Sequence, residues 1–179
     1  MNSLQPLIQD NIILRAPETN DITLMYAIEN DARLWLETNS TSQPISRHFL
    51  SAYLASSHND IYTDCQLRLV AEVEGSSIGL VDLFDFSPRH LRAEVGIGLA
   101  SQFRGKGYGK IILEILERYV SETLFIHQIY AHVAESNIAA INLFTKSNYE
   151  IVGKLKEWTK IGKEYESVYL FQKIFQKNR

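Results

Sequence analysis

The chain has 179 residues, of which 45% are hydrophobic and 22% charged, and its 18 basic against 21 acidic side chains leave a net charge of −3. This is the composition of one soluble domain, which we expect over residues 1–179 with a core from about 12 to 174. The sequence excludes a basic nucleic-acid-binding arm, a membrane span and a disulfide or cysteine-rich metal framework. Because the N-terminal residues also lack the features of a signal peptide, we expect a cytoplasmic protein with no metal, nucleic acid or membrane partner.

The first half of the chain alternates short apolar runs with capping and turn residues, which predicts short strands and helices. In order, these are a strand at 12–14, a helix at 24–28 behind capping residues 19–21, a turn-rich stretch at 35–44, a helix at 46–57, and strands at 66–74 and 77–86. Gly75 lies between the last two strands, so we expect them to form a hairpin.

The second half predicts a strand, a glycine turn and a long helix, then another strand and helix and a terminal hairpin. In order, these are a strand at 93–100, a helix from about Lys110, a strand at 128–134, a helix from Ser136 or Asn137 to about Lys146, and strands at 150–158 and 165–175 with a turn at 160–163. Asn148 is expected in a left-handed C-cap, where asparagine is used when glycine is not. This mixture, with a β–α–β unit in the middle, predicts a mixed sheet with helices on its faces.

The turn before the long helix carries Gly105, Gly107 and Gly109. Glycine lets the backbone approach a ligand closely, and the first N–H groups of a helix have no intrahelical partner, so this turn is suited to a phosphate. Its G-x-G-x-G spacing differs from that of dinucleotide folds, and Ile111 stands where a P-loop needs Ser or Thr for magnesium. We therefore expect a pyrophosphate held by backbone groups without a metal.

Two segments resemble the GNAT acetyltransferases. Residues Gln102-Phe-Arg-Gly-Lys-Gly-Tyr-Gly109 look like the Q/R-x-x-G-x-G/A loop of that family, and residues 137–149 are similar to its N-x-x-A-x-x-L-Y-x-K-x-G-F segment. The resemblance runs from about Ile12 to Phe171 and is closest to the branch of the ribosomal-protein N-terminal and polyamine acetyltransferases. It implies an α/β (α+β) fold with a mixed, mostly antiparallel sheet, helices on both faces and a central β–α–β unit that binds acetyl-CoA.

The resemblance also implies the reaction and the partners. The acetyl group of acetyl-CoA, a co-substrate, would pass directly from the thioester to a primary amine, carried by a protein N-terminus or by a small molecule. Similar proteins are commonly dimers, so a homodimer is a further expectation.

The 93–100 strand has one face almost without side chains, because Gly96, Gly98 and Ala100 share it with Glu94. Glycines weaken a strand unless a neighbouring helix or a ligand must come close. The resemblance implies that the pantetheine arm of acetyl-CoA pairs with this strand. The expected cofactor contacts are Ile97, Gly98, Leu99, Gln102, Arg104, Gly105, Lys106, Gly107, Tyr108, Gly109, Lys110, Asn137 and Phe144.

Three residues are candidates for the general base. A lysine-like amine has a pKa of about 10.4, so making it neutral at pH 7 costs roughly 4 to 5 kcal/mol, against about 1 kcal/mol for an α-amino group. Glu94 lies on the bare strand face beside the expected thioester. The resemblance adds Glu157, which precedes Trp158 as a proposed base does in the N-terminal acetyltransferase branch, and His132, which lies five residues before Asn137, where some relatives carry a carboxylate.

Phe144 departs from the family pattern, because many GNAT enzymes carry there a tyrosine that protonates the departing sulfur. The thiol pKa is about 8.5, so a thiolate can leave without an acid, or Asn137 or Ser136 can stabilise it by hydrogen bonding. Since the polyamine branch carries the tyrosine, the main hypothesis is acetylation of a protein N-terminus or of a small amine. The alternatives are a polyamine acetyltransferase and a protein that binds CoA without catalysing transfer.

Overall fold

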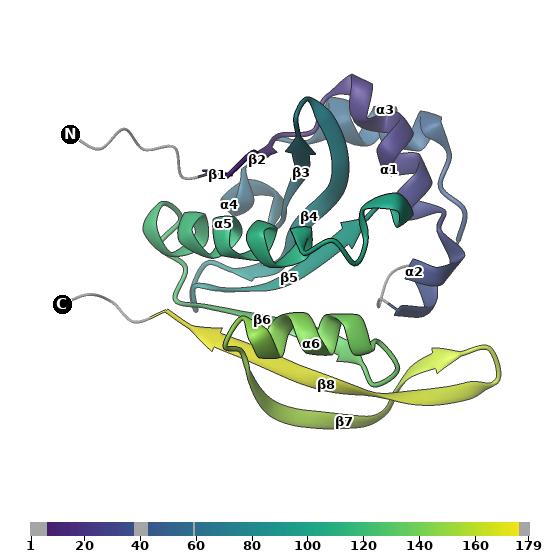
Figure 1. Cartoon of the computed structure of the whole chain (residues 1–179), viewed down its shortest axis with the longest axis vertical. Coiled ribbons are helices and arrows are strands. Elements are labelled where there is room, and N and C mark those ends of the chain that lie inside the picture. Colours follow the sequence, from purple (N-terminus) through teal and green to yellow (C-terminus); the bar gives the residue numbers. More distant parts are fainter. Residues whose placement is uncertain (1–6, 38–42, 59, 176–179) are drawn as a thin grey trace.

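The chain folds into a mixed eight-stranded sheet in the order β1-β2-β3-β4-β5-β6-β8-β7 (Figure 1). The computed structural model describes residues 7–37, 43–58 and 60–175. The strands are β1 (Ile8–Gln9), β2 (Ile12–Arg15), β3 (Leu67–Val73), β4 (Ser76–Ser87), β5 (Arg92–Leu99), β6 (Gln128–Ala134), β7 (Glu150–Ile161) and β8 (Glu164–Ile174). The α-helices are α1 (Ile22–Glu29), α2 (Ala32–Glu37), α3 (Arg47–Ser56), α4 (Ile61–Asp64), α5 (Tyr108–Glu122) and α6 (Ile138–Lys146), and short 3-10 turns span Thr19–Asp21 and Ser101–Phe103.

Helices α1 and α3 cover one face of the sheet. Met25 and Ile28 of α1 and Leu50 of α3 are buried against Val70 of β3 and Leu80 of β4. The strand side chains alternate, so the residues next to Val70 and Leu80 point to the opposite face. Ser46 is the N-cap of α3, and its side chain accepts a hydrogen bond from the Phe49 N–H.

Helices α5 and α6 cover that opposite face. The apolar side of α5 is buried in one cluster with residues of β2 to β6, and Phe144 of α6 packs against Phe171 of β8. The buried residues of α5 are Ile112, Leu113, Ile115, Leu116 and Val120. Helices therefore lie on both faces of the sheet, which confirms the expected architecture.

The sheet forks between β5 and β6, its one parallel pair of strands. In the described residues, these two strands pair only through Arg92–Glu94 and Gln128–Tyr130. Beyond Glu94, β5 continues beside β4, whereas β6 continues beside β8. Figure 1 shows the result: the half made of β6, β8 and β7 diverges from the half made of β1 to β5.

Several turns have the backbone that the sequence predicts. Glu74 and Gly75 connect β3 to β4 with φ angles of 49° and 77°, which is a two-residue hairpin turn. Gly162, with φ of 62°, lies in the turn between β7 and β8, and Asn148, with φ of 61°, follows α6 in the left-handed region.

Three short elements were not expected: β1, α2 and α4. The stretch predicted to be turn-rich, 35–44, begins within α2, and its residues 38–42 lie outside the described part of the chain. The signal for α2 was available, since the carboxylate of Asp31 accepts a hydrogen bond from the backbone N–H of Arg33 as an N-cap does. Helix α5 begins at Tyr108, two residues before the expected start. No helix among the described residues is long and apolar enough to cross a membrane.

Candidate active site

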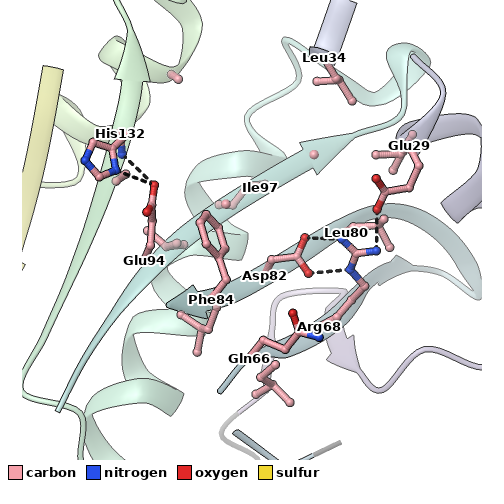
Figure 2. A pocket seen from close by; sticks show the side chains of 18 of the residues that line it. Glu29, Leu34, Gln66, Arg68, Leu80, Asp82, Phe84, Glu94, Ile97 and His132 are labelled. Carbon is pink, nitrogen blue, oxygen red and sulfur yellow. Dashed lines mark hydrogen bonds and ion pairs between the residues drawn. The ribbon is translucent and has the colours of Figure 1, made fainter. Parts of the chain in front are cut away.

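A cavity of about 680 Å³ opens at the fork of the sheet. Its floor is formed by β4 and β5, and it reaches β6 and α6 on one side and α1, α3 and β3 on the other. A volume of this size is typical of small-molecule sites. Figure 2 shows Glu94 and His132 at one end, Glu29, Arg68 and Asp82 at the other, and Phe84 between them.

Glu94 and His132, predicted separately as bases, form one pair. The Glu94 Oε1 atom lies 2.9 Å from His132 Nδ1 and also accepts a hydrogen bond of 3.3 Å from the His132 backbone N–H. Their side chains are only 12% and 19% exposed. The carboxylate is therefore held by two contacts at Oε1, and a neutral imidazole in this position donates its Nδ1 proton to it.

The histidine ring is in turn held by aromatic neighbours. Trp158 of β7 stacks on it with a centroid distance of 6.3 Å, and Tyr130 meets it edge-on at 5.8 Å. The Tyr130 hydroxyl donates to Asp85, and burial together with this carboxylate raises the pKa of Tyr130. His132 is thus fixed in orientation, and Trp158, although 55% exposed, covers one face of its ring.

Glu157 lies outside the cavity. It is exposed on an irregular part of β7, where the register with β8 shifts between Leu155 and Thr159, and its φ is 49°. Its neighbour Trp158 points to His132. The irregular part of β7 therefore brings Trp158 against His132, and Glu157 is not among the residues that line the cavity.

The glycine turn has the geometry that a phosphate site requires. Gly105 and Gly107 have φ angles of 73° and 86°, and a Cβ built on either would meet no atom within 4 Å. Gly107 is the N-cap of α5 and has no side chain, so it cannot occupy the first-turn N–H groups of the helix. Open space, left-handed glycines and a helix N-terminus fit a pyrophosphate.

The side chains around this turn differ in their surroundings. Arg104 is engaged within the protein, since its Nε donates to the Leu99 carbonyl and its guanidinium forms an ion pair with Asp31, both at 2.8 Å. Lys106 is exposed and lies 5.6 Å from the centre of the Phe103 ring. Lys106 therefore fits the expected phosphate contact better than Arg104.

The remaining loop residues lie at or beside the start of α5. Gln102 is exposed in the 3-10 turn, and Lys110 lies 3.7 Å from Glu114 one turn further along α5. Tyr108 packs edge-on against Phe103 at 6.2 Å. A Cβ on Gly109 would meet Leu143 of α6 at 3.5 Å, so this glycine lies where the two helices approach each other.

The bare face of β5 has a different neighbour from the one expected. A Cβ on Gly98 would come within 3.2 Å of Ile28 in α1, and one on Gly96 within 3.2 Å of Phe84. The glycines therefore make room for Ile28 of α1 and Phe84 of β4, and both glycines also line the cavity. A ligand that paired with β5 as an extra strand would bind at the edge of β5, which is no longer paired with β6 beyond Glu94. It would not need the face on which the glycines lie.

Of the other cofactor candidates, Ile97 and Gly98 line the cavity, as do Asn137 and Phe144, whereas Leu99 does not. The Asn137 side chain caps α6 by accepting a hydrogen bond of 3.0 Å from the Ala140 N–H. Phe144 is 5% exposed and packs against Tyr149 at 5.0 Å, so it is also part of the core.

The far end of the cavity was not predicted from the sequence. Arg68 of β3 forms ion pairs of 2.7 Å with Asp82 of β4 and 2.6 Å with Glu29 at the end of α1. Burial opposes the charge of Arg68, but Asp82 and Glu29 raise the pKa of its guanidinium. The available signal was a charged residue between apolar neighbours in each of two strands, Arg68 in β3 and Asp82 in β4. The described residues contain no group of three His, Cys, Asp or Glu side chains that could hold a metal.

Comparisons with known proteins identify the family. Residues 11–150 match the model of the acetyltransferase (GNAT) domain, and the chain belongs to this family. It is 27% identical over 165 residues to spermidine N(1)-acetyltransferase of Vibrio cholerae serotype O1, covering 90% of this chain and 91% of the relative. It is 26% identical over 160 residues to the enzyme of the same name from Escherichia coli K12, covering 88% and 82%.

Solved structures agree with this assignment. The crystal structure of the Vibrio cholerae spermidine N-acetyltransferase in complex with CoA and spermine has a TM-score of 0.79 and 27% identity, with 92% of this chain and 95% of that chain covered. A dodecameric structure of the same enzyme in an intermediate state has a TM-score of 0.76 and 26% identity, with 92% and 94% covered. The predicted fold and the predicted class, an acetyltransferase, are therefore confirmed.

Proposed function

We propose that the protein transfers the acetyl group of acetyl-CoA to a primary amine of a polyamine of the spermidine type. The observation that carries this proposal is the Glu94–His132 pair at the fork of the sheet, in a cavity whose other end contains Glu29 and Asp82. Carboxylates at both ends suit an acceptor with more than one positive charge. The similarity to spermidine N-acetyltransferases supports the polyamine alternative over acetylation of a protein N-terminus.

Glu94 is proposed as the general base. A polyamine is protonated at pH 7, and a positioned base contributes typically about 10²–10⁴-fold to the rate. Glu94 accepts one proton from the ammonium, and the neutral nitrogen forms a bond to the acetyl carbon. The C–S bond then breaks with its electron pair on sulfur, and the nitrogen releases its second proton to water. His132 is then a positioning residue, because its Nδ1 and backbone N–H hold Oε1 and leave Oε2 for the amine.

The backbone around Gly107 and the free edge of β5 are proposed to hold acetyl-CoA. The first-turn N–H groups of α5 suit the pyrophosphate, Lys106 adds a positive charge there, and the edge of β5 beyond Glu94 suits the pantetheine amides. Asn137 lies at the end of α6 that faces the same gap. Acetyl-CoA supplies the activated acetyl group, and the protein supplies alignment and the base.

The departing sulfur has no tyrosine hydroxyl at position 144. Phe144 is buried against Tyr149 and Phe171, so this position contributes an apolar wall. A thiol pKa of about 8.5 makes the thiolate an adequate leaving group at neutral pH. The same substitution motivates the second candidate function, a CoA-binding protein without transferase activity.

Release of free thiol from acetyl-CoA in the presence of an amine panel tests the proposal. The panel holds spermidine, spermine, putrescine, butylamine and peptides with free N-termini. We expect turnover with the polyamines at a higher kcat/KM than with the peptides. A preference for peptides would return the protein to the N-terminal class, and CoA binding without any thiol release would favour the non-catalytic candidate. The expected homodimer remains a prediction, to be measured by light scattering beside the dodecamer known for the Vibrio cholerae relative.

A further inference from the structure

The three charged residues at the far end of the cavity form one connected group. Arg68 donates through Nε and a terminal nitrogen to the two carboxylate oxygens of Asp82, at 2.7 and 3.0 Å, and through its other terminal nitrogen to Glu29 at 2.6 Å. The side chains of Arg68, Asp82 and Glu29 are 21%, 26% and 17% exposed. The guanidinium also lies 5.7 Å from the ring of Tyr53 on α3. Arg68 is therefore held on several sides, in a fixed orientation.

The group lies on the same face of the sheet as the proposed base. Asp82 is opposite Gly96 in the β4–β5 ladder, and Glu94 is opposite Phe84, so Glu94 and Asp82 are diagonal neighbours. Diagonal neighbours in an antiparallel pair are roughly 7–8 Å apart. This is within the reach of a short aliphatic chain between two nitrogens. Such a chain would pass along the ring of Phe84, which lies between the two ends and against Gly96 (Figure 2).

The charges of this group add to one net negative charge. Glu29 and Asp82 contribute two negative charges and Arg68 one positive charge, and Arg68 forms an ion pair with each carboxylate. Without Arg68, this end would carry two negative charges and would attract cations of higher charge more strongly. The arginine therefore acts as an internal cation that already occupies part of the binding capacity of the two carboxylates.

We propose that Arg68 is a specificity-determining residue that sets the charge of the acceptor at its distal end. The site then favours one distal ammonium at the Glu29–Asp82 end while the reacting amine lies at Glu94. This inference rests on the proposed function, because it concerns the acceptor of the same reaction. It predicts that acceptor preference follows the net charge of the group and not its shape alone.

The first test neutralises one carboxylate. Glu29→Gln preserves the side-chain shape and brings the group to zero net charge. We expect the ratio of KM for putrescine to KM for butylamine, two amines of equal chain length, to rise about tenfold, because only putrescine carries a distal ammonium. Glu72→Gln is the matched control, since Glu72 forms a 2.6 Å ion pair with Arg15 outside the cavity and should leave this ratio unchanged.

The second test removes and then restores the charge balance. Arg68→Met leaves the group with two negative charges instead of one. The ratio of kcat/KM for spermidine to kcat/KM for putrescine should therefore rise about tenfold. The double variant Arg68→Met/Glu29→Gln returns to one negative charge, and the wild-type ratio should return with it. Should both single variants keep the wild-type ratios while their melting temperatures show that they are folded, the inference is overturned.

A failure of the proposed function can be distinguished from a failure of the charge inference. If the wild-type protein acetylates no polyamine, the function fails whatever the variants do. The charge inference is then tested by calorimetry, in which the same amines bind to the CoA-saturated protein. Glu29→Gln should weaken the binding of putrescine about tenfold relative to the binding of butylamine. An unchanged binding ratio overturns the inference.

Discussion

Replacing Glu94 by glutamine is the most direct test of the proposed chemistry. The amide has nearly the same shape as the carboxylate, and its oxygen can still accept the hydrogen bonds from His132 Nδ1 and the backbone N–H that Glu94 receives at 2.9 and 3.3 Å. It cannot accept the proton of the attacking ammonium. Glu94→Gln therefore removes the base and keeps the arrangement that positions it.

The size of the effect follows from the proton that must be removed. At pH 7 the neutral form of an amine with a pKa of about 10.4 is roughly 4 to 5 kcal/mol less stable than the ammonium. Without a base, only the small neutral fraction present in solution can react. We expect kcat/KM for spermidine to fall about 10²–10⁴-fold at pH 7. The deficit should shrink by about tenfold for each pH unit as the pH approaches the pKa of the amine.

The assay is thiol release at saturating acetyl-CoA between pH 7 and 9.5, with melting temperatures to confirm that each variant is folded. Glu157→Gln is the comparison variant, because Glu157 was also predicted as a base but is exposed outside the cavity, and its rate should stay near that of the wild type. If Glu94→Gln matches the wild type at every pH, or if Glu157→Gln shows the pH-dependent deficit instead, the assignment of the base is refuted.

Three further changes test other parts of the structure. Gly107→Ala places a Cβ on a residue with φ of 86°, which should cost roughly 1–2 kcal/mol in stability and weaken the binding of acetyl-CoA measured by calorimetry. Gly109→Ala is the control, because its Cβ would meet Leu143 at an ordinary 3.5 Å, and it should change neither stability nor binding. Phe144→Tyr should raise kcat if protonation of the thiolate limits the rate; an unchanged kcat would show that the thiolate leaves unaided. Burial alone would raise the pKa of Asp21, but hydrogen bonds, above all from Arg15, lower it below the ordinary 3.8. Its stabilisation is therefore present above pH 4 and lost below, so Asp21→Asn should cost about 2 kcal/mol in urea unfolding at pH 7 and progressively less as the pH falls below 4, while an equal cost at pH 3 would contradict this reasoning.

The parts of the site that lie close together in sequence could be predicted. The glycine turn, the start of α5 and the Asn137 cap each depend on a few neighbouring residues, whose backbone preferences decide the structure. Glu94 was predicted from the alternation of side chains along one strand. What the alternation could not tell is which helix covers that face, so the glycines were assigned to the cofactor although Ile28 and Phe84 come close to them.

The parts that depend on distant residues could not be predicted. Glu94 and His132 were treated as competing bases, because their contact exists only once β5 and β6 lie side by side. Likewise, Arg68 joins residues 39 and 14 positions away, and no local pattern connects them. Short helices such as α2 and α4 were missed for a related reason, since helices of one or two turns depend more on packing than on their own propensity.

The fork gives Glu94 a second duty. It is the last residue of β5 that is paired with β6, and just past it the main-chain ladder between the two half-sheets stops. There its carboxylate accepts hydrogen bonds from His132, which lies two residues further along β6 than Tyr130, the ladder partner of Glu94. A side chain therefore connects the two strands just where the backbone hydrogen bonds between them end. The reacting group is thereby anchored to both arms at once, and any motion that spread them would have to break its contacts first.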